Sequence, residues 1–510
     1  TTGSRFSRCS FVTSNPVGIT VMFSRHLAGA GAAAAGACAL RLVPPAREAR
    51  CQTTVTSTTT VQQPDGSMVT KTITTSTPAA ARAPVDQNYP PHGLSEGVRK
   101  LPQWIQLGCG DAEYICPEKG ATFPGDECPE KMPDISKHSS FMAETLRADP
   151  GIYDRLRNKK TNMGVSLAKC VKTGFDNPGH PMIKTVGLVA GDEDSYEAFK
   201  ELFDPVVSAR HGGYPADAKH PTDMNPDNLL NTKIDPEGKY TLTTRCRTGR
   251  SVRGFRLPPA CTFEERRELE RVIVKGLMRL TGELKGQYLP LHGSRSFELM
   301  PTGMSEDQEE DLRKRGNLFQ EPDSTLLLSS GCGRHWPDAR GIFHNDAKNF
   351  FVWLNEEDHM RIVSMEKGDN VHAIFQRFAT ACATVQQVLK EEGYDFMHND
   401  HLGYILTCPS NLGTGLRAGT MAQLPLVSAR KDFRQICTKL GLQARGTAGV
   451  DSASVGGKWD ISNADRLGKS ETHLVNIFIH GVSTLIQWEK MLEKGENIDE
   501  LVAAAKAWNP

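Results

Sequence analysis

Arginine side chains recur beside glycines and at the ends of apolar runs along the second half of the chain. They stand in TTRCRTGR, NEEDHMR, NLGTGLRAG and ARGTAGVD, and comprise Arg245, Arg247, Arg361, Arg417 and Arg445. Each one alone is typical of a solvated surface residue. Together they suit a polyphosphate, because a guanidinium fork binds phosphate oxygens in pairs and stays charged at any relevant pH. The chain lacks the P-loop pattern, so these arginines would replace its lysine and amide cradle.

Three acidic residues, Glu356, Glu357 and Asp358, stand side by side between two apolar runs. A solvated turn would explain them equally simply. In the functional interpretation, one carboxylate pairs with a substrate guanidinium and takes its proton as the nitrogen attacks phosphorus. A single group would then supply both charge complementarity and orientation.

Cys408 follows an apolar run and precedes Pro409, Ser410 and a glycine-rich loop. In that setting, backbone amides and the Ser410 hydroxyl are expected to lower the pKa of the thiol. A buried structural cysteine is the alternative, and spacing alone does not decide between the two.

The elements that must position these residues form two folded units. Short helical patterns fill the region from about Pro133 to Ser208, including Ser195 to Phe203, and predict a small helical domain. Beyond Tyr240, three amphipathic helices alternate with apolar runs that have the composition of strands. The helices begin near Thr262, Val371 and Leu474, and the spacing of Thr262 and Glu265 predicts a capping box at the first of them. The predicted strands are FFVWLN from Phe350, RIVSM from Arg361 and YILT from Tyr404. This pattern predicts a sheet backed by helices.

Composition limits the other possibilities. Among 510 residues, 60 Lys and Arg balance 60 Asp and Glu, so no overall basic field would attract nucleic acid or anionic lipid. The 13 cysteines are scattered along a long chain, which is unlike a disulfide framework. The separations of Cys109, Cys116 and Cys128 match no zinc pattern. We expect no dedicated metal site.

The first part of the chain has a different character. From Met22 the sequence is rich in alanine, carries arginines and has no acid before Glu48, which resembles an organelle presequence. The Thr- and Val-rich run from Cys51 to Pro84 predicts a flexible extension. We therefore expect a leader over 1–50, an extension over 51–128, a small domain over 129–235 and a large catalytic domain over 236–510.

Long motifs also resemble those of the phosphagen (guanidino) kinases, and of creatine kinases most closely. They are NPGHP, TVGLVAGDEDSYEAF, RTGRS, LPPACT, WPDARGI, WLNEEDH, SMEKG, CPSNLGTGLRAG and DISNADRLGKSE, in this order, and the similarity extends from Pro129 to Leu501. The resemblance implies an α+β fold, in which a small all-α N-terminal domain joins a larger domain with an antiparallel β-sheet flanked by helices. It also implies a reversible phosphoryl transfer between MgATP and a guanidine, with Mg²⁺ carried on the nucleotide.

The resemblance assigns residues to roles. Glu357 is implied as the catalytic carboxylate, with Glu356 in its charge network and Cys408 as a reactive thiolate that Ser410 tunes. The guanidino substrate is expected at Ile183, Val186, Cys408 and Ser410. The nucleotide and its phosphates are expected at Thr243, Thr244, Arg245, Cys246, Arg247, Arg361, Arg417, Arg445, Gly446, Thr447 and Asp460.

Creatine and phosphocreatine are the favoured guanidino substrates, because the small-domain loop GHPMIKTVG has the length found in the creatine type. Arginine and taurocyamine kinases are the alternatives, and a tethered structural paralogue is the alternative from another class. Two histidines usual around the adenine are replaced by Gly316 and Met421, which predicts weakened nucleotide binding.

The resemblance also implies a homo-oligomer, either dimer or octamer. The leader favours the mitochondrial intermembrane space, with the cytoplasm or a flagellum as alternatives. The C-terminal tail lacks a basic cluster, so we expect weak or no membrane binding.

Overall fold

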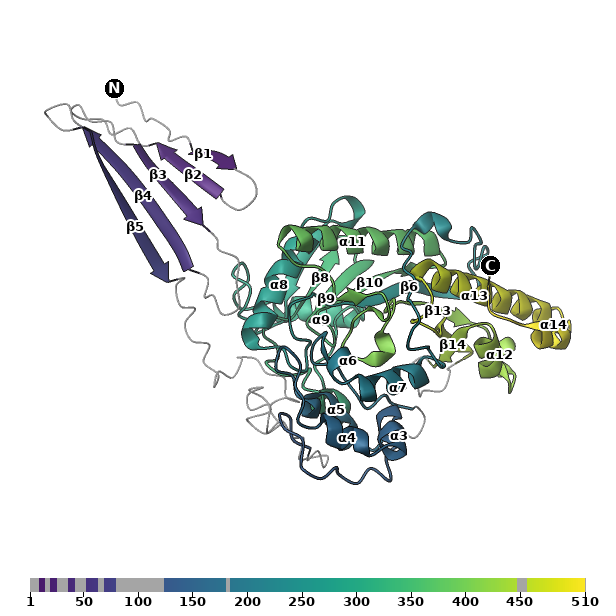
Figure 1. Ribbon diagram of the computed structural model, residues 1–510. Helices are drawn as coiled ribbons and strands as arrows, with labels where there is room; N and C mark the ends of the chain where they lie inside the picture. The colour runs from purple at the N-terminus through teal and green to yellow at the C-terminus, as the bar shows by residue number, and fades with distance from the viewer. Residues whose placement is uncertain are drawn as a thin grey trace. The chain divides into compact units, whose positions relative to one another are not determined.

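The computed structural model describes residues 123–179, 184–446 and 456–509, together with five strands between residues 9 and 78 (Figure 1). The chain divides into two units, Thr1–Tyr89 and Pro90–Pro510.

The N-terminal unit contains an antiparallel five-stranded sheet in the order β1-β2-β3-β4-β5. Its strands are Cys9–Thr13, Ile19–Ser24, Ala35–Arg41, Gln52–Gln62 and Met68–Pro78. Strands β4 and β5 fall in the Thr- and Val-rich run in which composition predicts a flexible extension. Threonine and valine are β-branched and favour extended backbone, which is the physical reason for this difference.

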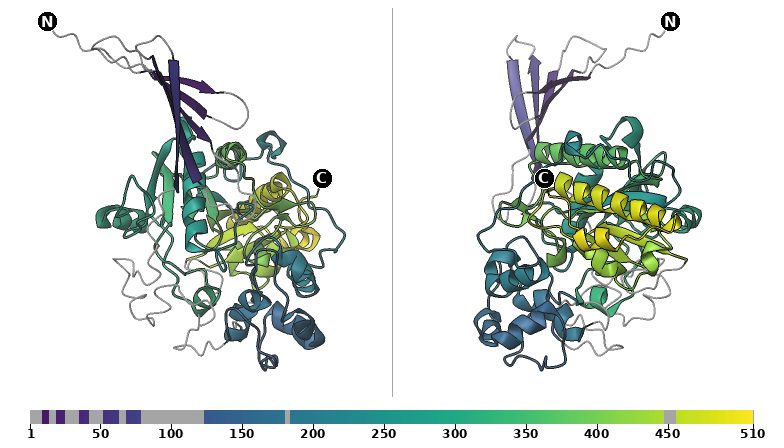
Figure 2. Two further views of the ribbon diagram at one scale, coloured as in Figure 1. Left: turned by 60° about the vertical axis from the view of Figure 1, so that its left-hand side comes forward. Right: turned by 90° about the vertical axis from the view of Figure 1, so that its right-hand side faces the viewer.

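The small domain of the second unit is helical, as predicted. Its helices are α3 Phe141–Ala148, α4 Gly151–Leu156, α5 Leu167–Asp176, α6 Ser195–Ala198 and α7 Lys200–Arg210. Apolar side chains from all five helices share one core. That core also includes Ile405 and Leu467 of the large domain, so the two domains pack directly against each other. Figure 2 shows these helices in blue, as a group beside the large domain.

The large domain is built on an antiparallel eight-stranded sheet in the order β14-β15-β13-β6-β10-β9-β8-β7. The strands are β6 Thr241–Arg250, β7 Gly286–Pro290, β8 Gly341–Asn345, β9 Phe350–Leu354, β10 Met360–Lys367, β13 Arg417–Gln423, β14 Leu442–Arg445 and β15 Lys458–Asn463. The predicted strands from Phe350 and Arg361 are confirmed as β9 and β10.

Three long helices cover one face of this sheet. They are α8 Phe263–Leu277, α11 Val371–Glu391 and α13 Glu471–Glu493, and their apolar residues form a single core with those of the strands. The capping box predicted at Thr262 is present: its hydroxyl accepts from the Glu265 amide, while the Glu265 carboxylate accepts from the Thr262 amide. Shorter helices are α9 Glu306–Lys314, α10 Thr325–Ser329, α12 Phe433–Lys439 and α14 Asp499–Ala504. The α+β fold class is therefore confirmed.

The predicted strand YILT is wrong in most of its length. Only Tyr404 belongs to a strand, the two-residue β12 Gly403–Tyr404, which pairs with β11 His398–Asn399. The backbone of the following residues bonds elsewhere: the Thr407 amide donates to the Asp358 carboxylate, and the Thr407 carbonyl accepts from the Ala190 amide. Since Ala190 belongs to the small domain, this segment joins the two domains.

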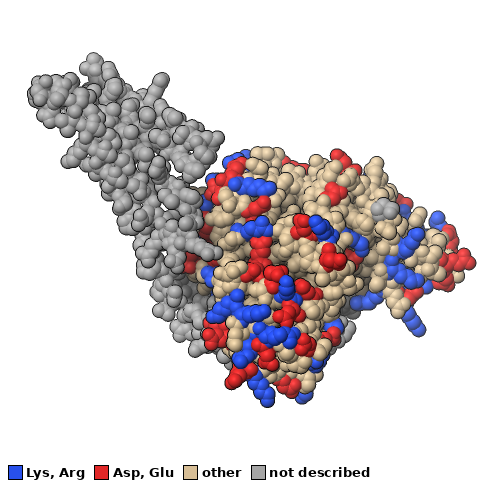
Figure 3. Space-filling model, viewed as in Figure 1, with Lys and Arg blue, Asp and Glu red and all other residues tan. Residues whose placement is uncertain are grey.

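Acidic and basic side chains are mixed on the face shown in Figure 3. Many are paired, as in the Arg271–Glu268 and Lys275–Glu392 ion pairs. Within the part of the chain that the structure describes, no helix has the length and apolar character needed to cross a bilayer.

Candidate active site

Strand β6 separates its side chains onto two faces, because successive residues of a strand point in opposite directions. Thr244 and Cys246 are fully buried, and Cys246 belongs to the core beneath the helices. Thr243, Arg245 and Arg247 are partly exposed on the opposite face. The structure thus brings the two arginines to the open face of the sheet, but it does not bring the Thr244 and Cys246 side chains there.

Strand pairing extends this open face across the sheet. Arg417 of β13 lies opposite Arg247, and Met421 lies between Thr243 of β6 and Asp460 of β15. Residues that face each other across a ladder present their side chains on the same side. The register therefore gathers residues from distant parts of the sequence into one cationic surface.

Asp460 bonds to two of these arginines at once. One carboxylate oxygen accepts from Nη2 of Arg245 at 2.7 Å and from Nη2 of Arg417 at 2.8 Å. Nε of Arg417 also donates to the Ser462 hydroxyl at 3.0 Å. Asp460 was predicted as a nucleotide contact; in the structure its contacts hold the arginines in place.

Arg361 lies among the three acidic residues. Its Nη2 donates to Glu357 at 2.7 Å and to Asp358 at 2.9 Å, and its Nε lies 3.4 Å from Glu356. Burial lowers the pKa of Arg361, but the three carboxylates outweigh this effect and raise it above its ordinary value. Burial also raises the pKa of the Asp358 carboxyl to about 6, although Arg361 opposes the shift. The acidic cluster is therefore not a solvated turn.

For Arg247 and Arg445 the compensation is only partial, because Glu356 and Asp460 respectively raise their pKa values by less than burial and the neighbouring arginines lower them. Within residues 123–179, 184–446 and 456–509, the Arg247 guanidinium makes no hydrogen bond or ion pair, and Arg445 bonds only to the neutral amide of Gln443. Burial and neighbouring arginines lower the pKa of Arg247 to about 9 and that of Arg445 to about 10. Two cations that are only partly compensated favour a polyanionic ligand at the site.

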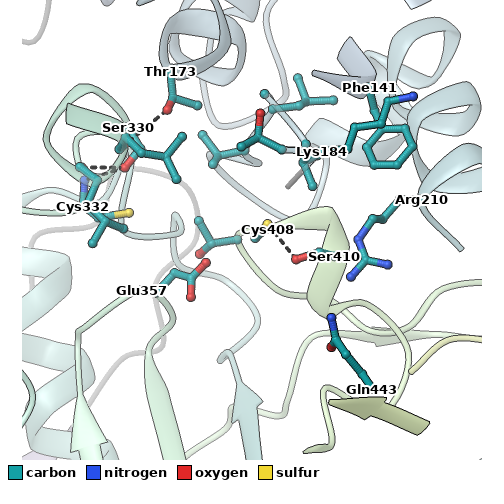
Figure 4. A pocket seen from close by; sticks show the side chains of 18 of the residues that line it. Phe141, Thr173, Lys184, Arg210, Ser330, Cys332, Glu357, Cys408, Ser410 and Gln443 are labelled. Atoms are coloured by element: carbon teal, nitrogen blue, oxygen red, sulfur yellow. Dashed lines mark hydrogen bonds between the residues drawn. The ribbon is translucent and has the colours of Figure 1, made fainter. Parts of the chain in front are cut away.

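A cavity of about 440 Å³ opens beside these arginines, between the two domains. Glu357, Cys408 and Cys332 lie on one side of it, and Lys184, Phe141 and Arg210 on the other (Figure 4). Apolar residues complete the wall: Val186, Leu188, Val189, Leu326 and Leu327. Its shape and chemistry suit a small molecule with a cationic end near Glu357.

Cys408 lies in this cavity, and its Sγ is 3.1 Å from the Ser410 hydroxyl. The expectation of a lowered thiol pKa is wrong. Burial and the negative charge of Glu357 raise the pKa of Cys408 to about 11, while the Ser410 hydroxyl opposes this shift. A positively charged group bound between Glu357 and Cys408 would reverse the electrostatic part of the effect.

Some predicted residues are placed differently or lie outside the described ranges. Val186 and Ser410 line the cavity, and Gly446 directly follows β14. Ile183 and Thr447 lie outside the described residues. Gly316, with φ of 70°, follows α9 where the chain leaves the helix, a conformation that glycine adopts readily.

Sequence reasoning missed several polar residues of the cavity, among them Arg210 and Gln443. Gln443 precedes Arg445 by two positions, so a strand prediction over this segment would have placed both side chains on one face. Arg210 ends α7, and no local pattern marks it, because the packing of the small domain on the large one brings it to the cavity.

The arrangement can perform an in-line phosphoryl transfer to nitrogen. Arginines on the open face of the sheet can hold a polyphosphate, and the adjoining cavity can hold a guanidinium against Glu357. Among the described residues, no cluster of three or more His, Cys, Asp or Glu side chains could hold a metal ion.

Family models agree with this chemistry. The model of the ATP:guanido phosphotransferase N-terminal domain matches residues 136–208. That of the ATP:guanido phosphotransferase C-terminal catalytic domain matches residues 268–492.

Curated relatives and solved structures extend the likeness. The chain is 50% identical over 378 residues to creatine kinase M-type of Rattus norvegicus, which covers 74% of this chain and 96% of that protein. It is 51% identical over 378 residues to creatine kinase B-type of Gallus gallus, with the same coverage. The crystal structure of lombricine kinase matches with a TM-score of 0.67 and 43% identity, over 73% of this chain and 98% of that one. The substrate-free duplicated taurocyamine kinase from Schistosoma mansoni matches with a TM-score of 0.63 and 37% identity, over 70% of this chain and 48% of that one.

Proposed function

The chain belongs to the ATP:guanido phosphotransferase family, and from this premise we propose that it is a creatine kinase. As a member of this family it is a phosphagen kinase, whose substrates are ATP or ADP and a guanidino compound. The finer assignment to creatine rests on 50% identity to creatine kinases over nearly their whole length. The half-buried Val186, which lines the cavity, supports it by offering an apolar contact to the N-methyl group.

In the proposed reaction, Glu357 takes a proton from the guanidinium of creatine as its nitrogen attacks the γ-phosphorus of MgATP. A nitrogen–phosphorus bond forms while the bond from phosphorus to the bridging oxygen breaks, and MgADP leaves. Arg247 and Arg445, whose charges are only partly compensated, stabilise the negative charge on the transferring group. The reverse reaction uses the same groups in the opposite order.

One observation supports this mechanism most directly. Glu357 lines the cavity between the two domains and also bonds to Arg361 on the sheet. One carboxylate thus connects the acceptor site to the arginine clamp, which consists of Arg245, Arg247, Arg361, Arg417 and Arg445. A bound guanidinium would find its counter-ion beside the phosphoryl group that it attacks.

A second candidate acceptor is a guanidine with a more acidic tail, such as taurocyamine. Two observations favour it: the likeness to lombricine and taurocyamine kinase structures, and the cationic side chains of Lys184 and Arg210 at the end of the cavity away from Glu357. Lys184, however, is already paired with Glu144, which reduces its pull on an anionic tail.

The deciding experiment is an ADP-release assay on the full chain with creatine, arginine, glycocyamine, taurocyamine and lombricine. We expect the highest kcat/KM with creatine. Preference for another guanidine would refute the creatine assignment and leave the family chemistry intact. No turnover with any of the five would favour a tethered structural role.

Location and assembly are proposed on composition and family likeness. We propose that the Met22 leader directs the protein to the mitochondrial intermembrane space, and that it assembles as a dimer or octamer with weak or no membrane binding. Fractionation of cells that express the chain from Met22 tests the location. Light scattering of the purified protein tests the assembly.

A further inference from the structure

Four of the five arginines of the clamp, all except Arg247, are held by side-chain partners of different kinds among the described residues. Arg361 bonds to carboxylates, and Arg245 and Arg417 share the carboxylate of Asp460. Among the described residues, Arg445 bonds to a neutral group and to no carboxylate: Oε1 of Gln443 accepts from its Nη2 at 2.9 Å and from its Nε at 3.3 Å.

The orientation of the Gln443 amide follows from chemistry. Arginine only donates hydrogen bonds, so the amide oxygen must face Arg445 and the NH₂ group must face elsewhere. Figure 4 shows the Gln443 nitrogen on the side toward Arg210 and the cavity. Gln443 and Arg445 both line that cavity with Glu357 and Cys408.

The backbone fixes this pair. Gln443 and Arg445 lie two residues apart on β14, on one face, opposite Ser462 and Asp460 of β15. Arg445 is half-buried beside the cationic Arg417 and Arg210, which together with burial lower its pKa. Without an acceptor, its flexible side chain would turn away from these charges toward solvent.

We propose that Gln443 is a positioning residue of the phosphoryl-transfer site, which orients the Arg445 guanidinium toward the transferring group without neutralising it. A carboxylate at this position would make the same two bonds, but it would cancel the positive charge of Arg445 that stabilises the phosphoryl group during its transfer. An amide supplies orientation alone. The inference rests on the proposed phosphotransferase function, but not on creatine as the acceptor.

The test compares Gln443→Met and Gln443→Glu with the wild-type full chain, using whichever guanidine the wild type turns over fastest. Met keeps the length of the side chain and removes the acceptor, whereas Glu keeps the acceptor and adds a negative charge. Gln387→Ala, on the exposed face of α11, is the matched control outside the site. The readouts are kcat, the KM of each substrate and Tm.

We expect Gln443→Met to lower kcat by roughly 10-fold to 100-fold, with the KM for the guanidine within about twofold of the wild type. Gln443→Glu should lower kcat further and raise the KM for MgATP, because it cancels the charge of Arg445. Both variants should keep the Tm of the wild type. Wild-type kcat in Gln443→Met would overturn the proposal, as would equal losses in both variants with a lowered Tm. If the protein turns over another guanidine but not creatine, the ratios of the variants' kinetic constants to those of the wild type are unaffected. That outcome therefore refutes only the creatine assignment.

Discussion

Replacing Glu357 by glutamine tests the central step of the mechanism with little disturbance of the fold. The amide oxygen of glutamine can still accept from Nη2 of Arg361, which also keeps its 2.9 Å bond to Asp358 and its proximity to Glu356. What disappears is the proton acceptor and one of three negative charges. Loss of a general base typically costs 10²-fold to 10⁴-fold in rate, which corresponds to roughly 3–5 kcal/mol of transition-state stabilisation.

Cys408 provides an independent readout in the same variant. Glu357 is the main charged group that raises the pKa of this thiol, after burial itself. Glu357→Gln should therefore lower the pKa of Cys408, and iodoacetamide should alkylate the thiol faster at pH 8, because the thiolate is the reactive form. Steady-state kinetics and mass spectrometry of the labelled protein measure the two effects.

Glu366→Gln is the matched control, since Glu366 lies on β10 like Arg361 but pairs with Arg377 away from the cavity. It should leave kcat and the alkylation rate unchanged. If Glu357→Gln retained kcat within threefold of the wild type, the assignment of the general base would be wrong. An unchanged alkylation rate would contradict the electrostatic account of Cys408.

Three further predictions concern stability and nucleotide binding. Burial raises the pKa of Glu270 to about 7, so the folded protein holds this proton more tightly than the unfolded chain does, and stability should fall as pH rises from about 4.5 to 7. Glu270→Gln should flatten that dependence and raise Tm at pH 8, as measured by calorimetry between pH 5 and 8. Arg247→Met should abolish turnover while keeping or raising Tm, because it removes a partly buried cation that has no hydrogen-bond or ion-pair partner among the described residues. Met421→His should lower the KM for MgATP; an unchanged KM would refute the idea that this position weakens nucleotide binding.

Local patterns in the sequence predicted much of the large domain. The capping box at Thr262 and the helical spacing that follows it predicted α8, and the apolar runs from Phe350 and Arg361 predicted β9 and β10. Alternation along a strand predicts that Arg245 and Arg247 share a face. Each of these features depends on residues a few positions apart, which a single sequence displays directly.

Features that depend on long-range contacts escaped prediction. The run from Tyr404 looks like a strand, but Thr407 bonds to Asp358 and Ala190, which lie far away in the sequence. The neighbours of Cys408 in the sequence indicate a lowered thiol pKa, whereas burial and Glu357 raise it. In both cases contacts between residues far apart in the sequence determine the outcome, and the local sequence does not record them.

The different partners of the arginines explain how one site can be both rigid and strongly cationic. Asp460 fixes two arginines with one negative charge, so this group of three keeps a net positive charge and a defined geometry. Arg247 and Arg445 bond to no carboxylate among the described residues, and burying them is costly until a polyanion binds. Binding of the nucleotide therefore relieves a destabilisation already present in the folded protein. This coupling predicts that affinity for the nucleotide and thermal stability without it will change in opposite directions when either partly compensated arginine is replaced.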